Sequence, residues 1–403
     1  MVAMMHKPKL LPPDAVRVLS SPLEVRAADW DALLAQQSDP SPFMRHAYLA
    51  ALHESDSATP ATGWMPHIFT LWRPSGTAGD PDVLVAACAL YVKDHSYGEY
   101  VFDWAWANTY QQHGLRYYPK AVVAVPFTPV PGARLMARDD AARQALLAAV
   151  LEWCQDQKLS SLHLLFVQDH ELPACVEAGL MLRHTVQFHW KNTMPGYTSF
   201  DGFLSALTQE KRKKIRQERR KVVEARVTFR WSLGTEISAT DWDFFYCCYE
   251  RTYLEHGNAP YLSRDFFHRM ARTMPENWLL FVAERDGQPI ATSLIAVHAD
   301  STGAKVAYGR YWGALERVDC LHFEACYYQP LQWCIEHGFQ RFEGGAQGEH
   351  KMARALMPVK TTSAHWLAHP AFANAVENYL EREGAGIHEY LDDLRERSPL
   401  KRV

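Results

Sequence analysis

A glycine-rich segment in the C-terminal part of the chain, residues 344–351, combines groups that could move a proton and hold an oxyanion. Its glycines would expose backbone amides, and Glu349 and His350 are candidate bases. Lys351 and Arg354 follow as candidate anion partners. Attack of an amine on an activated carbonyl needs both functions, because the amine loses a proton while the carbonyl oxygen gains charge. Alternatively, the glycines only shape a turn after a strand, with the charged side chains in solvent.

Arg310 lies in an apolar run, where an unpaired arginine would be costly to bury. Either it faces a cleft and binds an acidic substrate, or it pairs with Glu324 or Glu343. The strand period of two would place Tyr308 and Trp312 on its face. Glu343 is also an acid or base candidate, and Glu324 could instead complement a helix dipole. The candidate catalytic residues are Glu349, His350 and Glu343, and the candidate substrate-binding residues are Arg310, Tyr308, Trp312, Glu324, Gln347, Lys351 and Arg354.

The elements that would position these residues are clearest in the second half of the chain. Hydrophobic periodicity predicts the order β-α-α-β-β-β-α-β, followed by a strand and closing helices. Asp286-Gly287 predicts a hairpin turn, and residues 321–336 predict a helix. Pro330 inside this helix removes a backbone donor, so we expect a kink or two shorter helices.

Composition limits the class of protein. The chain has 403 residues, 48% of them apolar, and 42 basic against 46 acidic residues give a net charge of −4, which excludes a disordered chain or a fibre. The longest apolar run, residues 83–92, is too short to cross a bilayer as a helix, and residues 1–14 lack a secretory core, so we expect a cytoplasmic protein, with peripheral attachment to the inner membrane as an option. Eight cysteines without C-x-x-C, and no H-E-x-x-H, predict neither disulfides nor a metal site.

Both halves show a similar predicted order of elements, and each reaches a strand with the same aromatic signature. The signature is His189-Trp190 in one half and His365-Trp366 in the other, 176 residues apart. We therefore predict a duplicated α/β unit, with domains at residues 1–195 and 196–403. The alternative is two unrelated strand ends that share a His-Trp pair.

This order of elements resembles the GNAT acyltransferase fold, and its duplication is similar to that of the Fem-type transferases that attach amino acids to peptidoglycan precursors. Several motifs resemble more closely the FemAB-like peptidoglycan biosynthesis/recognition proteins, a family of predicted N-acyltransferases. The resemblance covers nearly the whole chain. The motifs that carry it are residues 93–100 (KDHSYGEY), 117–120 (YYPK), 126–130 (PFTPV), 308–313 (YGRYWG), 321–324 (LHFE) and 345–351 (GAQGEHK).

The resemblance implies an α/β (α+β) fold of tandem GNAT-like units, with mixed, mostly antiparallel sheets and flanking helices. It implies transfer of an acyl or aminoacyl group, from acyl-CoA or aminoacyl-tRNA, to an amine of a cell-envelope precursor or amino-lipid. The alternative is a non-catalytic protein that binds a peptidoglycan or lipid precursor. No tightly bound cofactor is expected, and acyl-CoA is a candidate co-substrate. However, residues 313–320 hold one glycine and two acids, which would repel a diphosphate.

Two segments could bind phosphate. Residues 129–134 contain Gly132 and Arg134 in an acid-free turn, although the prolines there remove donors and a rigid turn is the alternative. Residues 211–221 hold eight basic residues, and Arg212, Arg216 and Arg219 would point outward from an amphipathic helix. This helix could bind tRNA, an anionic membrane surface or the phosphates of CoA, or it could simply be solvated. The oligomeric state is not predicted.

Overall fold

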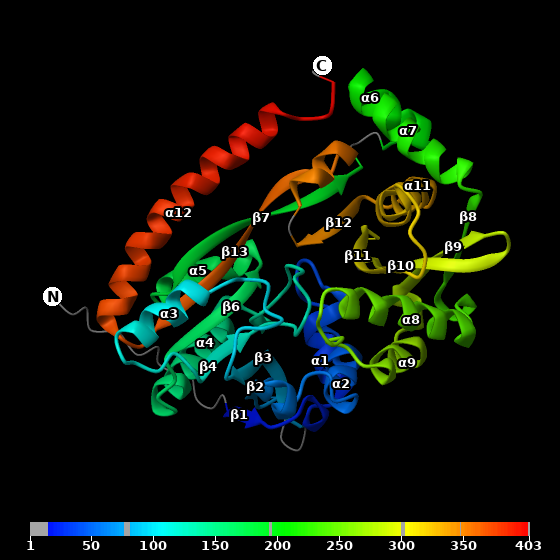
Figure 1. Ribbon diagram of the computed structural model, residues 1–403. Coiled ribbons are helices and arrows are strands. Elements are labelled where there is room, and N and C mark those ends of the chain that lie inside the picture. The colour runs from blue at the N-terminus through cyan, green and yellow to red at the C-terminus, as the bar shows by residue number, and fades with distance from the viewer. Residues whose placement is uncertain (1–14, 76–80, 193–195, 300–302, 347, 402–403) are drawn as a thin grey trace. The chain divides into compact units, whose positions relative to one another are not determined.

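The computed structural model describes residues 15–75, 81–192, 196–299, 303–346 and 348–401 (Figure 1). The chain divides into two compact units. Unit 1 comprises residues 1–185 and 361–386, and unit 2 comprises residues 186–360 and 387–403. In the part of the chain described, no helix combines the length and the apolar composition that a membrane span requires.

Unit 1 is built on strands in the order β1-β2-β3-β4-β6-β13, with β5 beside β3. Neighbours are antiparallel except β4 and β6, which are parallel and are connected through helix α4. Leu146, Leu147 and Val150 of α4 pack in one core with residues of β2, β3 and β6. The elements are β1 (Ala15–Leu19), α1 (Ala27–Leu34), α2 (His46–Glu54), β2 (Met65–Arg73), β3 (Val83–Lys93), α3 (Trp104–Gln112), β4 (Lys120–Val123), β5 (Met136–Ala137), α4 (Asp140–Asp156), β6 (Ser161–Val167) and α5 (Leu172–Glu177).

Unit 2 repeats this plan with strands in the order β7-β12-β11-β10-β9-β8. Only β11 and β12 are parallel, and the chain between them forms α10, the π-helical turn η7 and α11. The remaining elements of the chain are β7 (Met181–Lys191), α6 (Phe200–Ala206), α7 (Gln209–Glu224), β8 (Val227–Leu233), α8 (Ala239–Glu255), α9 (Arg264–Thr273), β9 (Trp278–Arg285), β10 (Gln288–Ala299), β11 (Lys305–Ala314), α10 (Leu321–Phe323), η7 (Glu324–Tyr328), α11 (Gln329–Glu336), β12 (Arg341–Ala346), the 3-10 helix η8 (Glu349–Arg354), β13 (Met357–Leu367) and α12 (Pro370–Glu396). Residues 361–367 of β13 and residues 370–386 of α12 belong to unit 1.

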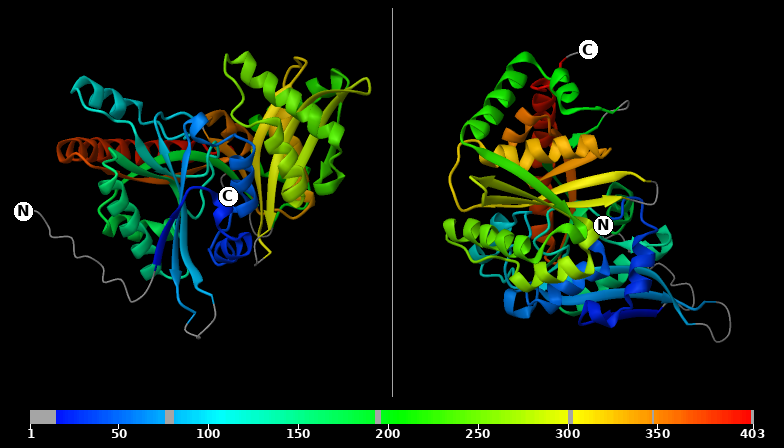
Figure 2. Two further views of the ribbon diagram at one scale, coloured as in Figure 1. Left: turned by 90° about the horizontal axis from the view of Figure 1, so that it is seen from below. Right: turned by 90° about the vertical axis from the view of Figure 1, so that its right-hand side faces the viewer.

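Helices cover both faces of the sheet in unit 2 (Figures 1 and 2). Helices α8 and α9 lie on one face, where the rings of Phe245, Tyr249 and Phe267 pack around Tyr311 of β11. Helices α6, α7 and α11 lie on the opposite face, over a core that contains Ile295 of β10. This second face carries the candidate site.

Several local predictions are confirmed. Asp286 and Gly287 both adopt positive φ angles, 52° and 76°, and form the tight turn between β9 and β10. The irregularity expected near Pro330 is the π-helical turn Glu324–Tyr328, which ends just before Pro330 enters the first turn of α11. The wider π-helical turn accommodates the proline, which has no N–H to donate and would clash with the carbonyl four residues earlier in a regular α-helix.

The division of the chain differs from the predicted boundary between residues 195 and 196. Strands β7 and β13 each contribute to both units, because residues 186–191 of β7 belong to unit 2 while residues 361–367 of β13 belong to unit 1. The His-Trp signature from the first half of the chain, at His189, therefore lies in unit 2. The signature from the second half, at His365, lies in unit 1. Local hydrophobic periodicity finds such strands but cannot tell with which neighbours they pair.

Candidate active site between strands 11 and 12

A β-bulge interrupts β11 at Arg310. Leu294 and Ile295 are consecutive in β10, but they pair with Tyr311 and Gly309, so Arg310 is the extra residue. The bulge breaks the alternation of side chains, and the prediction that Tyr308, Arg310 and Trp312 share one face is wrong. Arg310 donates to the Tyr311 hydroxyl (3.2 Å) on the side of α8 and α9.

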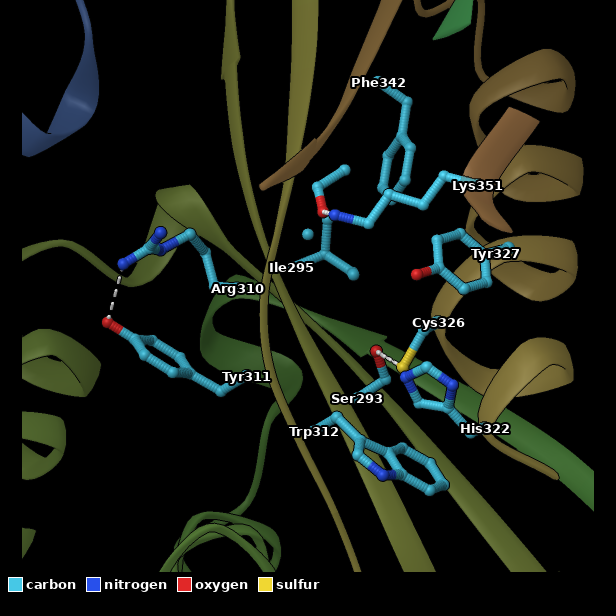
Figure 3. A pocket seen from close by; sticks show the side chains of 12 residues that line it. Ser293, Ile295, Arg310, Tyr311, Trp312, His322, Cys326, Tyr327, Phe342 and Lys351 are labelled. Carbon is cyan, nitrogen blue, oxygen red and sulfur yellow. Dashed lines mark hydrogen bonds between the residues drawn. The ribbon is translucent and has the colours of Figure 1, made fainter. Parts of the chain in front are cut away.

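Trp312 points to the opposite face from Tyr311, where its ring lies 5.4 Å from that of His322 (Figure 3). An extra residue in one strand disrupts the regular hydrogen-bond ladder of the sheet. Backbone N–H groups at such an irregularity can stabilise an oxyanion, so the bulge is a candidate oxyanion site.

Strands β11 and β12 pair only at their beginnings. The parallel pairing joins Val306–Tyr308 to Arg341–Glu343, and beyond it the two strands have no pairing among the described residues. A cavity of about 140 Å³ occupies this gap (Figure 3). Its wall consists of Ser293, Ile295, Gly309, Arg310, Tyr311, Trp312, His322, Cys326, Tyr327, Phe342, Gly344 and Lys351.

The helical wall of the pocket comes from α10 and η7, which supply His322, Cys326 and Tyr327. In a regular α-helix, positions i and i+5 point in different directions. The π-helical turn has more residues per turn, and it places the rings of His322 and Tyr327 5.7 Å apart. Sequence reasoning missed Tyr327 and Cys326, although the motif at residues 321–324 marked the start of this segment.

Lys351, which was predicted to bind substrate, is a buried cation of the pocket wall. Its Nζ donates to the carbonyl oxygens of Gly344 (2.6 Å) and Gly345 (3.2 Å). Burial lowers the pKa of Lys351 to about 8. Gly344 is needed for this packing, because a Cβ atom there would lie 2.5 Å from Leu356 and 3.2 Å from the Lys351 side chain.

Glu349 and His350, the two candidate bases, are exposed and lie outside the wall of the pocket. Glu349 accepts from Arg397 (2.6 Å) and Tyr390 (3.2 Å) of the C-terminal segment, so its carboxylate has other partners. His350 keeps a link to the pocket, because its Nε2 lies 3.3 Å from the Tyr327 hydroxyl. Gln347, the substrate-binding candidate two residues before Glu349, lies outside the described residues.

The pocket favours neutral imidazoles and a protonated phenol. Partial burial lowers the pKa of His350, and Lys351 and Arg354 act in the same direction. His322 keeps an exposed edge, yet desolvation of its inner side, together with His350 and Arg354, lowers its pKa as well. Burial raises the pKa of Tyr327 well above its usual value. Near neutral pH the imidazoles can therefore accept a proton while Tyr327 can donate one.

Arg354, Glu324 and Arg219 were expected to bind substrate or anions, but they form structural ion pairs. Arg354 donates to both carboxylate oxygens of the buried Glu218 (2.9 and 3.1 Å). Arg219 lies 3.0 Å from the buried Glu324. Both pairs join helix α7 to the segment behind the pocket, so these side chains are committed to holding the helix in place.

Glu343 and Tyr308 are buried on the side of the sheet away from the pocket. They are register partners at the paired start of the two strands. Arg341 lies 3.0 Å from Glu343, and His189 lies 3.9 Å from it. Burial lowers the pKa of His189 to about 3, with Arg341 acting in the same direction. Neither Glu343 nor Tyr308 lines the cavity, so this position does not support the roles predicted for them.

The predicted anion site at Gly132 and Arg134 is wrong. The N–H of Gly132 donates to the carbonyl of Phe166 (3.1 Å). Arg134 is buried and donates to the carbonyls of Leu165 (2.7 Å) and Val130 (2.6 Å). Both donors are used inside unit 1, so this segment is a structural turn.

Helix α7 does present cations to solvent. Ile215, Glu218 and Val222 are its buried residues, while Lys213, Lys214, Arg216, Arg220 and Lys221 are exposed and Arg212 is half-buried. The connection from β11 to α10 carries the exposed Asp319, which lies 3.9 Å from Lys221, and Glu316, which pairs with Arg285. The two acids of this connection do not fit the diphosphate of CoA.

No group of three or more His, Cys, Asp or Glu side chains in the described ranges could hold a metal ion. A search of curated proteins finds no match. The family model for FemAB-like proteins, described as peptidoglycan biosynthesis/recognition, matches residues 21–402. The chain belongs to the FemAB-like family. This family assignment confirms the resemblance of the sequence motifs over nearly the whole chain.

Two solved structures have a fold similar to that of this FemAB-like chain. The C-terminal domain of a proposed lysylphosphatidylglycerol synthetase from Agrobacterium fabrum superposes with a TM-score of 0.51 at 10% identity, covering 88% of this chain and 96% of that one. A tandem GNAT protein from the clavulanic acid biosynthesis pathway gives a TM-score of 0.48 at 13% identity, covering 89% and 99%. The fold is the tandem GNAT-like α/β fold that the order of elements predicted.

Proposed function

We propose that this FemAB-like protein is an N-acyltransferase, which moves an acyl or aminoacyl group from an activated ester or thioester to an amine. The observation that carries the proposal is the pocket between β11 and β12, where the Tyr327 hydroxyl, the bulge at Arg310 and the Lys351 ammonium face one space (Figure 3). The family description, peptidoglycan biosynthesis/recognition, supports a cell-envelope precursor as the source of the amine. An amino-lipid is the second acceptor that we propose.

In this proposal the amine nitrogen attacks the carbonyl carbon of the donor within the gap. The carbonyl oxygen becomes an oxyanion, and backbone N–H groups of the bulge and the positive Lys351 stabilise it. The imidazole of His350 accepts the proton that the amine loses. The bond between carbon and the leaving oxygen or sulfur then breaks, Tyr327 protonates the leaving group, and its contact with His350 returns a proton to Tyr327. The products are an amide and a free alcohol or thiol.

The exposed cations of α7 support a second part of the proposal, that an anionic portion of the donor, or an anionic membrane that carries the acceptor, lies against this helix. Arg219 has no part in this surface, since it is paired with Glu324. Positive charge on one helix raises the local concentration of anions without demanding a particular one.

Mass-spectrometric detection of new amides tests the proposal, with purified protein, a panel of activated acyl donors and amine acceptors. We expect donor-dependent amide formation that Tyr327→Phe reduces at least a hundred-fold. Thermal stabilisation by an acceptor, with no amide from any donor, would instead favour a recognition protein without catalysis.

A further inference from the structure

The charged side chains in the wall of the pocket have one sign. Among the described residues of its wall, Arg310 and Lys351 are cations and none is a carboxylate. Arg310 turns toward Tyr311, so Lys351 is the cation whose Nζ reaches the cavity (Figure 3). Its ammonium is held by two backbone carbonyls, which leave its net positive charge in place.

Four carboxylates in the surrounding elements do not balance this charge, because each of the four has a cationic partner of its own. A positively charged ligand in the pocket would therefore lose its water and find no counter-charge. The ion pairs are Glu324 with Arg219, Glu218 with Arg354, Glu343 with Arg341, and Glu349 with Arg397.

The size of the pocket sets a second limit. Its volume of about 140 Å³ is close to the roughly 150 Å³ of an engineered protein cavity that binds benzene. A group of about six non-hydrogen atoms fits such a space. A long fatty chain would have to extend outside it.

The polar groups of the wall suit a carbonyl or carboxylate. Tyr327 and Ser293 offer hydroxyl donors, and Lys351 offers an ammonium. Ile295 and Phe342 supply apolar surface for a short carbon chain, and Trp312 and His322 close the pocket at its other end (Figure 3).

We infer that this pocket binds the acyl part of the donor, and that this acyl group is short and either uncharged or carboxylate-bearing. The inference rests on the proposed transferase function. It decides between the two classes of donor, those that carry an acyl group and those that carry an aminoacyl group. Acyl groups that carry an ammonium are rejected, which includes α-aminoacyl esters with a free amino group.

Ligand-observed ¹⁹F NMR with the full-length protein tests the inference without turnover. The probes are 3-fluoropropionate, 3-fluoropropionamide and 3-fluoropropylammonium, which are similar in size and differ in charge. We expect the first two to bind and the ammonium to bind at least ten-fold more weakly. Equal affinity for the ammonium and the carboxylate would overturn the inference.

The variant Lys351→Gln tests whether 3-fluoropropionate binds in this pocket. We expect the variant to bind 3-fluoropropionate at least ten-fold more weakly than the wild type and 3-fluoropropionamide within three-fold. An unchanged affinity for the carboxylate would place the probe elsewhere and overturn the inference. If the variant does not fold, the three probes on the wild-type protein still decide it.

Turnover with matched thioesters separates this inference from the proposed function. Amide formation from a β-alanyl thioester as efficient as from a propionyl thioester would overturn the pocket inference and keep the transferase. Discrimination among the NMR probes, with no amide from any donor, would keep the pocket inference and overturn the transferase.

Discussion

The Tyr327 hydroxyl lies 3.3 Å from Nε2 of His350, and the two side chains come from elements that precede and follow β12 in the sequence. Tyr327 belongs to the π-helical turn and lines the pocket, whereas His350 belongs to η8 and stays at the exposed rim. The contact joins a phenol that stays protonated to an imidazole that stays neutral near pH 7. Such a pair can carry a proton between solvent and the buried gap.

Tyr327→Phe should lower the rate of amide formation by at least a hundred-fold, because the leaving group loses its proton donor. The affinity for the donor should change less than three-fold. Steady-state kcat and KM for one donor separate the two effects. Tyr379→Phe on α12 is the matched control, since it removes an exposed hydroxyl that donates to Glu383. A loss confined to KM would show that Tyr327 only binds substrate.

Glu349→Gln should leave the rate of amide formation within about three-fold of the wild type, because Glu349 is bound to Arg397 and Tyr390 outside the pocket. The ion pair is half-exposed, and pairs of this kind contribute at most about 1 kcal/mol. Arg397→Gln should therefore behave in the same way. A hundred-fold loss in Glu349→Gln alone would identify Glu349 as the base.

Arg354→Met should lower the free energy of unfolding by about 3–5 kcal/mol, because it leaves the buried Glu218 without its partner. Glu218→Gln should also destabilise the protein. The double variant should be more stable than the sum of the single effects, since neither charge is then stranded. Urea unfolding of the four proteins gives the coupling energy. Strict additivity would contradict the pairing.

His189 should make stability depend on pH. Its pKa is lowered to about 3 in the fold and is about 6.5 in the unfolded chain, so below pH 6.5 only the unfolded chain gains the proton. The contribution of neutral His189 to the free energy of unfolding is complete above pH 6.5. As the pH falls from 6.5 toward 3, this free energy decreases by about 1.4 kcal/mol per pH unit. His189→Gln lacks this loss. The difference in unfolding free energy between the two proteins should therefore change below pH 6.5 and stay constant above it.

Lys213, Lys214 and Arg220 should bind anionic lipid surfaces from the exposed side of α7. Replacing all three by glutamine should weaken sedimentation with vesicles containing phosphatidylglycerol, because each cation near such a surface contributes about 1 kcal/mol. The control removes the same charge from the exposed Arg138, Arg272 and Lys360. Equal losses of vesicle binding in both triple variants would indicate a general charge effect. The same comparison with bulk tRNA in place of vesicles tests whether α7 binds RNA instead.

The sequence was sufficient for the features that depend on neighbours within one turn or hairpin. Asp286-Gly287 predicted its hairpin because the turn needs positive φ angles, and Pro330 predicted a break because proline has no N–H. The order of these elements, repeated in each half, predicted the tandem GNAT-like fold. Lys351, which the glycine-rich segment marked as a substrate-binding candidate, lines the pocket, and its role stays a prediction.

The tertiary structure decided which charges are free to act. Glu349 pairs with Arg397, 48 residues away, and Arg354 pairs with Glu218, 136 residues away. The bulge at Arg310 depends on the register with β10, and the site of Tyr327 depends on the π-helical turn. Spacing along the chain predicts only local geometry, whereas these contacts arise when distant elements pack. A carboxylate that looks like a base in the sequence can therefore be paired with a cation from another element.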